Sequence, residues 1–262
     1  MPPHGIARRC AAIRGAAFLL LAMIALAPRS WAQADVDVAL VLVTDVSRSI
    51  DDSEYRLEKA GYAAAFTDER VIAAIKGGPL GALAVTYVEF AGTSEVRTVL
   101  PWTIIRDQHT ARGFVDALEA EPRSFWGRTS ISTGIDHAVT LLMEGGPSAM
   151  RKVIDVCGDG TNNAGRDSAA ARDDAVALGI TINGLAIINE NPVSWSLAHV
   201  QPPGGLANYY RENVTGGPGN FVVEIRDFRT FGEAMTRKLI REISSGPVPA
   251  RLAQQGLHSA HP

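Results

Sequence analysis

Apolar runs alternate with amphipathic segments along most of this chain. Val36–Thr44 is almost continuous in valine, alanine and leucine, which is typical of a strand buried on both faces of a parallel sheet. Similar patterns predict further strands at Gly81–Ala91, Glu95–Trp102, Lys152–Cys157, Gly179–Ile188 and Phe221–Ile225. Mixed apolar and charged segments predict helices at 53–75, Asp107–Ala120, Ile131–Met143, Asp167–Leu178, Leu206–Arg211 and Phe228–Ile243.

This alternation predicts one doubly wound α/β domain over residues 35–245, with a mostly parallel sheet and helices on both faces. One edge strand is expected to be antiparallel. The link Gly92–Ser94 joins two predicted strands and is too short for a crossover, so these strands should form a hairpin. Residues 246–262 are expected to form a flexible C-terminal tail.

The first 34 residues have the composition of a secretory signal peptide. A basic start with Arg8 and Arg9 precedes the apolar segment Gly15–Ala27, which is short for a membrane span. Small residues follow, with cleavage expected after Ala32 or Ala34. An uncleaved anchor is the alternative. The prediction is an exported protein, periplasmic or secreted.

Charge and cysteine content narrow the class of partner. Removing residues 1–34 takes away four of the 25 Lys and Arg residues and none of the 28 acidic ones, which leaves a net charge of about −7. This balance argues against nucleic acid as the main partner. Cys157 would be the one cysteine of the mature chain, so no intrachain disulfide is expected. No second long apolar segment follows, and we therefore expect no transmembrane segment in the mature chain.

Oxygen-bearing side chains gather at the ends of two predicted strands. Asp45, Ser47 and Ser49 alternate after the first strand, so their side chains can point the same way. Asp159 follows the strand Lys152–Cys157, and Thr129 begins a later helix. Ligands of doubly wound sheets bind beyond the carboxyl ends of the strands. A carboxylate and neutral hydroxyls suit Mg²⁺, or Mn²⁺ in its place, and no His/Cys cluster suggests zinc.

The pattern "DVSRS", then "GRT", then "GDG" resembles the metal-ion-dependent adhesion site of von Willebrand factor type A domains. Segments such as "YVEFAG", "VIDVCGDGTNN" and "GITINGLAI" are similar to a group of uncharacterised exported bacterial proteins with this domain. The resemblance implies that Ser47 and Ser49 contact the metal directly. It implies that Asp45 and Asp159 bind the metal directly or through water. It also implies that Thr129 joins the coordination shell of the metal when a ligand is bound.

Two positions depart from the family pattern. Gly158 stands where Thr or Ser is common, and Arg128 stands where Gly is usual. Arg128 places a cation beside the predicted metal, where it would either repel the ion or attract an acidic partner.

The predicted function is metal-bridged protein binding without a chemical step. The resemblance implies that an acidic side chain of an unknown protein partner completes the coordination of the metal. The alternative is an Mg²⁺-dependent phosphate hydrolase, because "GDGTNN" resembles the acidic loop of haloacid-dehalogenase-like phosphatases. In those enzymes a second Asp acts as acid and base, and here that position is Ser47.

Overall fold

A computed structural model describes residues 36–188 and 202–244 of the chain. The predicted signal peptide (1–34) and tail (246–262) lie outside these residues and stay predictions. Within the described ranges, no helix is long and apolar enough to cross a membrane.

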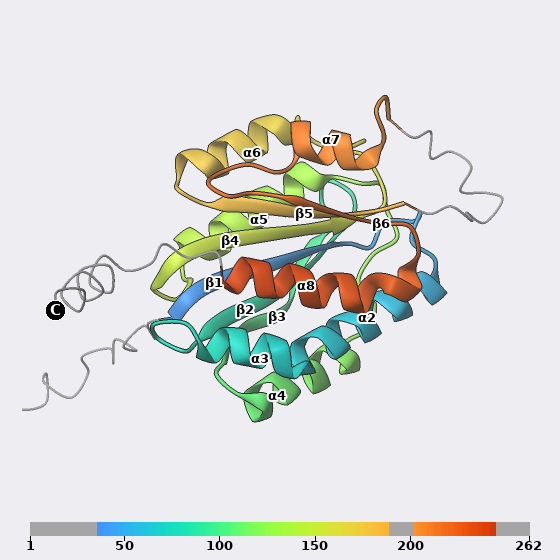
Figure 1. The fold of residues 1–262 in the computed structure, drawn as a ribbon. Helices are drawn as coiled ribbons and strands as arrows, with labels where there is room; N and C mark the ends of the chain where they lie inside the picture. Colours follow the sequence, from blue (N-terminus) through green and yellow to red (C-terminus); the bar gives the residue numbers. More distant parts are fainter. Residues whose placement is uncertain (1–35, 189–201, 245–262) are drawn as a thin grey trace, which may run out of the picture. The chain divides into compact units, whose positions relative to one another are not determined.

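Six strands form one sheet in the order β3-β2-β1-β4-β5-β6 (Figure 1). All neighbours are parallel except β2 and β3, which form the predicted hairpin at one edge. The strands are β1 (Val36–Asp45), β2 (Leu83–Phe90), β3 (Val96–Ile105), β4 (Ala149–Gly158), β5 (Thr181–Ile187) and β6 (Val222–Ile225). The doubly wound α/β fold is thereby confirmed.

Helices cover both faces of the sheet. One face carries α2 (Asp52–Thr67), α3 (Glu69–Lys76), α4 (Gln108–Ala120) and α8 (Phe231–Ser244) (Figure 1). The other carries α5 (Ile131–Met143), α6 (Ser168–Ala177) and α7 (Leu206–Asn213). Alternate residues of β1 supply the two cores, with Leu40 and Leu42 on the first face and Val41 and Val43 on the second. Every residue of β1 is buried, as its continuous apolar run predicts.

The prediction of a single helix over 53–75 is wrong. Asp68 adopts an extended conformation that ends α2, and its side chain accepts a hydrogen bond from the amide of Arg70 that begins α3. An aspartate favours such a cap because its oxygen satisfies an amide that the helix leaves unpaired. The segment predicted as helix 228–243 likewise opens with a 3₁₀ turn, η3 (Phe228–Thr230), before α8.

Candidate metal centre

The fold brings Asp45 and Asp159 to one point of the sheet. β1 pairs with β2 on one side and with β4 on the other, so the strand order reverses between β1 and β4. Thr44 pairs with Cys157, and Asp45 and Asp159 follow these residues at the carboxyl ends of the two strands. This is the topological switch point, where ligands of doubly wound sheets bind.

All five predicted residues meet there in one hydrogen-bond chain. Thr129 Oγ1 donates to Ser47 Oγ at 3.0 Å, and the hydroxyls of Ser47 and Ser49 lie 3.1 Å apart. Ser49 Oγ donates to Asp159 Oδ1 at 2.7 Å, and the amide of Ser47 donates to Asp45 Oδ1 at 2.7 Å. None of the five is more than 6% exposed. Ser49 and Asp159, which are 110 positions apart in the chain, therefore share one buried cluster.

The second carboxylate oxygen of Asp45 is placed where a cation would stabilise it. Asp45 Oδ2 is buried and has no hydrogen-bond partner among the described residues. Burial and, to a smaller extent, the nearby Asp159 charge raise the pKa of the Asp45 carboxyl from 3.8 to about 7. An unpaired buried carboxylate oxygen is costly, and a cation would stabilise its ionised form.

The donor set fits a hard divalent cation. Two carboxylates and three hydroxyls offer oxygen atoms alone, which Mg²⁺ and Mn²⁺ accept. Among residues 36–188 and 202–244, no group of three or more His, Cys, Asp or Glu side chains is placed to hold a metal. A zinc site rich in His and Cys is therefore absent from this part of the chain.

Two further acids lie close enough to the cluster to interact with its charges. Burial raises the pKa of Glu54 to about 7, with the charges of Asp51 and Asp159 adding to the shift. Burial also raises the pKa of Glu58 well above its ordinary value, and the charges of Asp45 and Asp159 contribute. Both residues lie on α2, which begins just after the Asp45–Ser49 turn. A cation bound at the cluster would favour the ionised form of both carboxyls and so lower their pKa values.

The structure explains the departure at Gly158. A Cβ atom at this position would lie 2.9 Å from Asp45 Cβ and 2.9 Å from Tyr210 Oη. Real Cβ atoms do not approach other heavy atoms this closely, so Thr or Ser would force both Asp45 and Tyr210 to move. Glycine is therefore the residue that this packing allows.

Arg128 is held by a neighbouring loop. Its guanidinium donates to Asn163 Oδ1 at 3.3 Å and to the Asn163 carbonyl oxygen. The amide of Thr129 also donates to Asn163 Oδ1, at 3.1 Å, and the Asn162 side chain accepts from the amide of Ser132 at 3.1 Å. The loop after β4 thus fixes the position of Thr129. Sequence reasoning did not assign this role to the two asparagines.

Arg123 is a second residue that sequence reasoning missed. Its Nη2 donates to the carbonyl oxygens of Val46 and Ser47, each at 2.9 Å, and its Nε donates to the Phe125 carbonyl oxygen at 3.0 Å. Its guanidinium also lies over the rings of Tyr55 and Trp126. The buried Arg123 therefore holds the backbone of the Asp45–Ser49 turn against the loop that leads to Thr129. Backbone carbonyls have no sequence signature, so only the fold could reveal this contact.

The raised pKa of Asp45 predicts a pH-dependent response to metal. In the metal-free protein, the neutral carboxyl stabilises the fold fully below its ordinary pKa of 3.8, and this contribution is lost as the pH rises to about 7. A cation requires the ionised carboxylate. We therefore expect the apparent affinity for Mg²⁺ to weaken about tenfold per pH unit below pH 7. Melting temperatures measured across Mg²⁺ titrations between pH 5.5 and 7.5 would test this. An affinity that stays constant over that range would contradict it.

Known structures share this fold. A mussel byssus protein, proximal thread matrix protein 1 with a zinc-occupied MIDAS motif, has 19% sequence identity and a TM-score of 0.54. The match covers 81% of this chain and 49% of that one, so this chain spans about half its length. A von Willebrand factor type A protein from Catenulispora acidiphila has 17% identity and a TM-score of 0.54, covering 79% and 43% of the two chains.

A pilus adhesin, SpaC from Lactobacillus rhamnosus GG, has the same fold over 79% of this chain and 31% of its own. Its identity is 13% and its TM-score 0.55. None of the curated proteins matches the chain. The fold and the arrangement of strands define a von Willebrand A-like domain.

Within that class, the protein belongs to the family described as "Protein of unknown function (DUF1194)", which matches residues 35–247. The family match covers almost the same span as the domain predicted from sequence.

Proposed function

We propose that this protein is an exported adhesion-type module that binds a protein partner through a divalent cation, Mg²⁺ or Mn²⁺. Asp45, Ser47, Ser49, Thr129 and Asp159 would hold the ion. The observation that carries the proposal is the buried hydrogen-bond chain of these five residues, with Asp45 Oδ2 left unpaired among the described residues.

The cation would supply a positive charge that attracts an acidic side chain of the partner. The two carboxylates, ionised when the cation is bound, at most balance its two positive charges. The three hydroxyls contribute lone pairs without charge. A site of this composition leaves the metal able to accept a further carboxylate.

The surface around the cluster suits an acidic partner. Trp126 is 58% exposed on the loop before Thr129, and its ring is packed against Arg123. Arg48 and Arg128 are also exposed, and the amide of Arg48 donates to the Gly127 carbonyl oxygen at 3.1 Å. An aromatic ring beside exposed arginines is a composition that protein interfaces favour.

Metal-dependent stabilisation tests the ion site. If the ion binds only the folded state, Mg²⁺ at 100 times its Kd adds about 2.7 kcal/mol, which corresponds to roughly 5–10 °C in Tm for a domain of this size. Asp45→Asn should abolish this increase, and Asp116→Asn, an exposed aspartate on α4, should keep it. A wild-type Tm that does not respond to millimolar Mg²⁺ or Mn²⁺ would argue against the ion.

Partner capture tests the binding function. Immobilised protein should retain an envelope protein in the presence of Mg²⁺ and release it on chelation. Asp45→Asn and Thr129→Ala should fail to retain it, and Asp116→Asn should behave like the wild type. Retention that is insensitive to chelator would contradict metal bridging.

N-terminal sequencing of the exported protein would test cleavage after Ala32 or Ala34.

Phosphate hydrolysis remains the second candidate. Asp45 would attack phosphorus, and a second group would move the proton. The position of that second group, two residues after Asp45, is occupied by Ser47. Its hydroxyl accepts a hydrogen bond from Thr129. Turnover of an aryl phosphate that is lost in Asp45→Asn would favour the hydrolase and overturn the binding proposal.

A further inference from the structure

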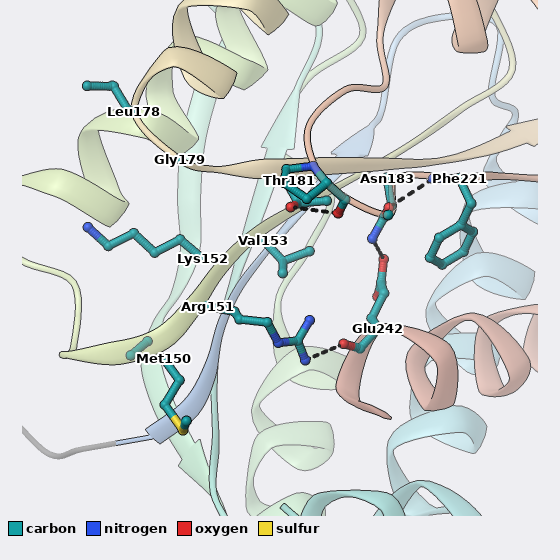
Figure 2. Close-up of a pocket in the computed structure, with 13 residues that line it drawn as sticks. Met150, Arg151, Lys152, Val153, Leu178, Gly179, Thr181, Asn183, Phe221 and Glu242 are labelled. Carbon is teal, nitrogen blue, oxygen red and sulfur yellow. Dashed lines mark hydrogen bonds between the residues drawn. The ribbon is translucent and has the colours of Figure 1, made fainter. Parts of the chain in front are cut away.

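The opposite end of the sheet carries a cavity that the metal centre does not use. β4 begins four residues before its neighbour β5, because Val153 pairs with Thr181, the first residue of β5. Among the described strands, residues 149–152 of β4 therefore have a neighbour only on the β1 side. A cavity of about 400 Å³ occupies the space beside them, at the lower end of the range for small-molecule sites. Figure 2 shows its lining residues.

The cavity wall is positively charged. Arg151 and Lys152 line it, and Glu242 is the single acid among its described lining residues. Glu242 is already engaged, since its Oε1 lies 2.5 Å from Lys238 Nζ and accepts from Asn183 Nδ2 at 2.9 Å. Neither Arg151 nor Lys152 forms an ion pair with any described residue. The local excess of positive charge contrasts with the net negative chain.

Arg151 is placed to hold an anion. Its Nη2 donates to the carbonyl oxygens of Glu242 and Ile243, at 2.7 and 2.9 Å, which fixes the guanidinium at the end of α8. Both of these hydrogen bonds use the same nitrogen, so the remaining donors are available to a ligand. Figure 2 shows Arg151 pointing toward Glu242 and Lys152 pointing away from it. Arg151 would thus contact an anion directly, and Lys152 would contribute charge from the strand's other side.

Apolar groups complete the wall. Val153 is buried on the cavity floor, and the ring of Phe221 lies under the Arg241 guanidinium at 3.8 Å from the ring centroid. Met150 and Leu178 are 53% and 49% exposed, and both line the cavity. An apolar wall beside a fixed cation is suited to a ligand with a charged group and an apolar body.

We propose that this cavity binds a small organic acid, whose carboxylate contacts Arg151 and whose apolar body lies against Val153 and Phe221. The site lies at the amino ends of β4 and β5, whereas the metal centre lies at the carboxyl ends of β1 and β4. Binding here therefore does not require that the metal proposal be correct.

Hexanoate, its neutral analogue hexanamide and inorganic phosphate are the probes for this site. Ligand-observed NMR on the purified protein, with chelator present to remove divalent cations, should show binding of hexanoate at millimolar concentration. Hexanamide and phosphate should bind at least tenfold more weakly. Equal binding of hexanamide would overturn the anionic contact, equal binding of phosphate would overturn the apolar one, and no binding of hexanoate would overturn both.

Two substitutions test whether hexanoate binds in this cavity. Arg151→Gln should weaken hexanoate at least tenfold. Because Arg151 also caps α8, Lys152→Glu provides a second variant. Among the described residues the Lys152 ammonium donates a hydrogen bond only to Met143 Sδ, at 3.3 Å, and reversal of its charge should weaken hexanoate binding about threefold or more. Lys76→Glu, an exposed lysine at the end of α3, should leave binding unchanged. Hexanoate affinity that is the same in both cavity variants and the wild type would overturn the assignment.

Discussion

Lys238→Met is expected to lower the free energy of unfolding by about 3–5 kcal/mol. Lys238 Nζ lies 2.5 Å from both Asp155 Oδ1 and Glu242 Oε1, and all three side chains have no exposed surface. The substitution would leave two buried acids without their cation. These acids join β4 and α8, and Glu242 is also held by Asn183 of β5. Urea denaturation at pH 8 measures the loss.

The cost should depend on pH. Burial already raises the pKa of Glu242 to about 7, and the Asp155 charge adds to the shift. Removing the lysine raises the folded-state pKa of both acids further, so stability present at low pH is lost as the pH rises. The variant should therefore be less destabilised at pH 5.5 than at pH 8.

Matched variants separate charge from volume in this cluster. A triple variant that also carries Asp155→Leu and Glu242→Leu should recover most of the lost stability, because an apolar cluster needs no cation. Arg237→Met, its exposed neighbour in sequence, should change stability by less than about 0.5 kcal/mol. If Lys238→Met cost no more than Arg237→Met, the buried ion pairs would not stabilise α8.

Arg123→Ala is expected to cost about 2–4 kcal/mol, because it leaves the buried carbonyls of Val46 and Ser47 without a donor. It should also reduce or abolish the Mg²⁺-dependent rise in Tm, since these carbonyls belong to the turn that carries Asp45 and Ser49. Arg123→Lys should be intermediate, because an ammonium cannot reproduce the planar fork of the guanidinium. Thermal denaturation with Mg²⁺ and with chelator measures both effects.

Arg48→Ala is the matched control for Arg123. Arg48 lies in the same turn, but its side chain is exposed, so its removal should leave both stability and the metal response close to wild type. A normal metal response in Arg123→Ala would show that the turn keeps its conformation without the guanidinium. That result would contradict the positioning role.

The sheet was largely predictable because its strands have strong local signals. The apolar runs Val36–Thr44 and Lys152–Cys157 correctly marked two central strands, and their adjacency placed Asp45 beside Asp159. The break at Asp68 was missed because apolar residues continue on both sides of it, with Phe66 before and Val71 after. Periodicity detects a buried face, and it does not detect a single extended residue within that face.

The oxygen donors of the candidate site could be predicted from the sequence. The residues that hold these donors in place could not. The donors follow strand ends, where a break in the apolar pattern makes them visible. Arg123 and Asn163 act through backbone groups, so nothing in their own sequence positions distinguishes them from ordinary loop residues. Glu58 is a similar case: it accepts a hydrogen bond from the buried Cys157 Sγ at 3.1 Å, and nothing in its sequence position distinguishes it from an exposed acid on α2.

The crowding at Gly158 limits how this chain can change over time. Ser or Thr can enter position 158 only if both the Asp45 side chain and the Tyr210 hydroxyl move away, because these two groups already fill the space. A change at Tyr210 of α7 alone would relieve one of the two clashes and leave the other. Position 158 is therefore restricted both by a helix more than 50 positions away in the chain and by a carboxylate of the candidate metal centre.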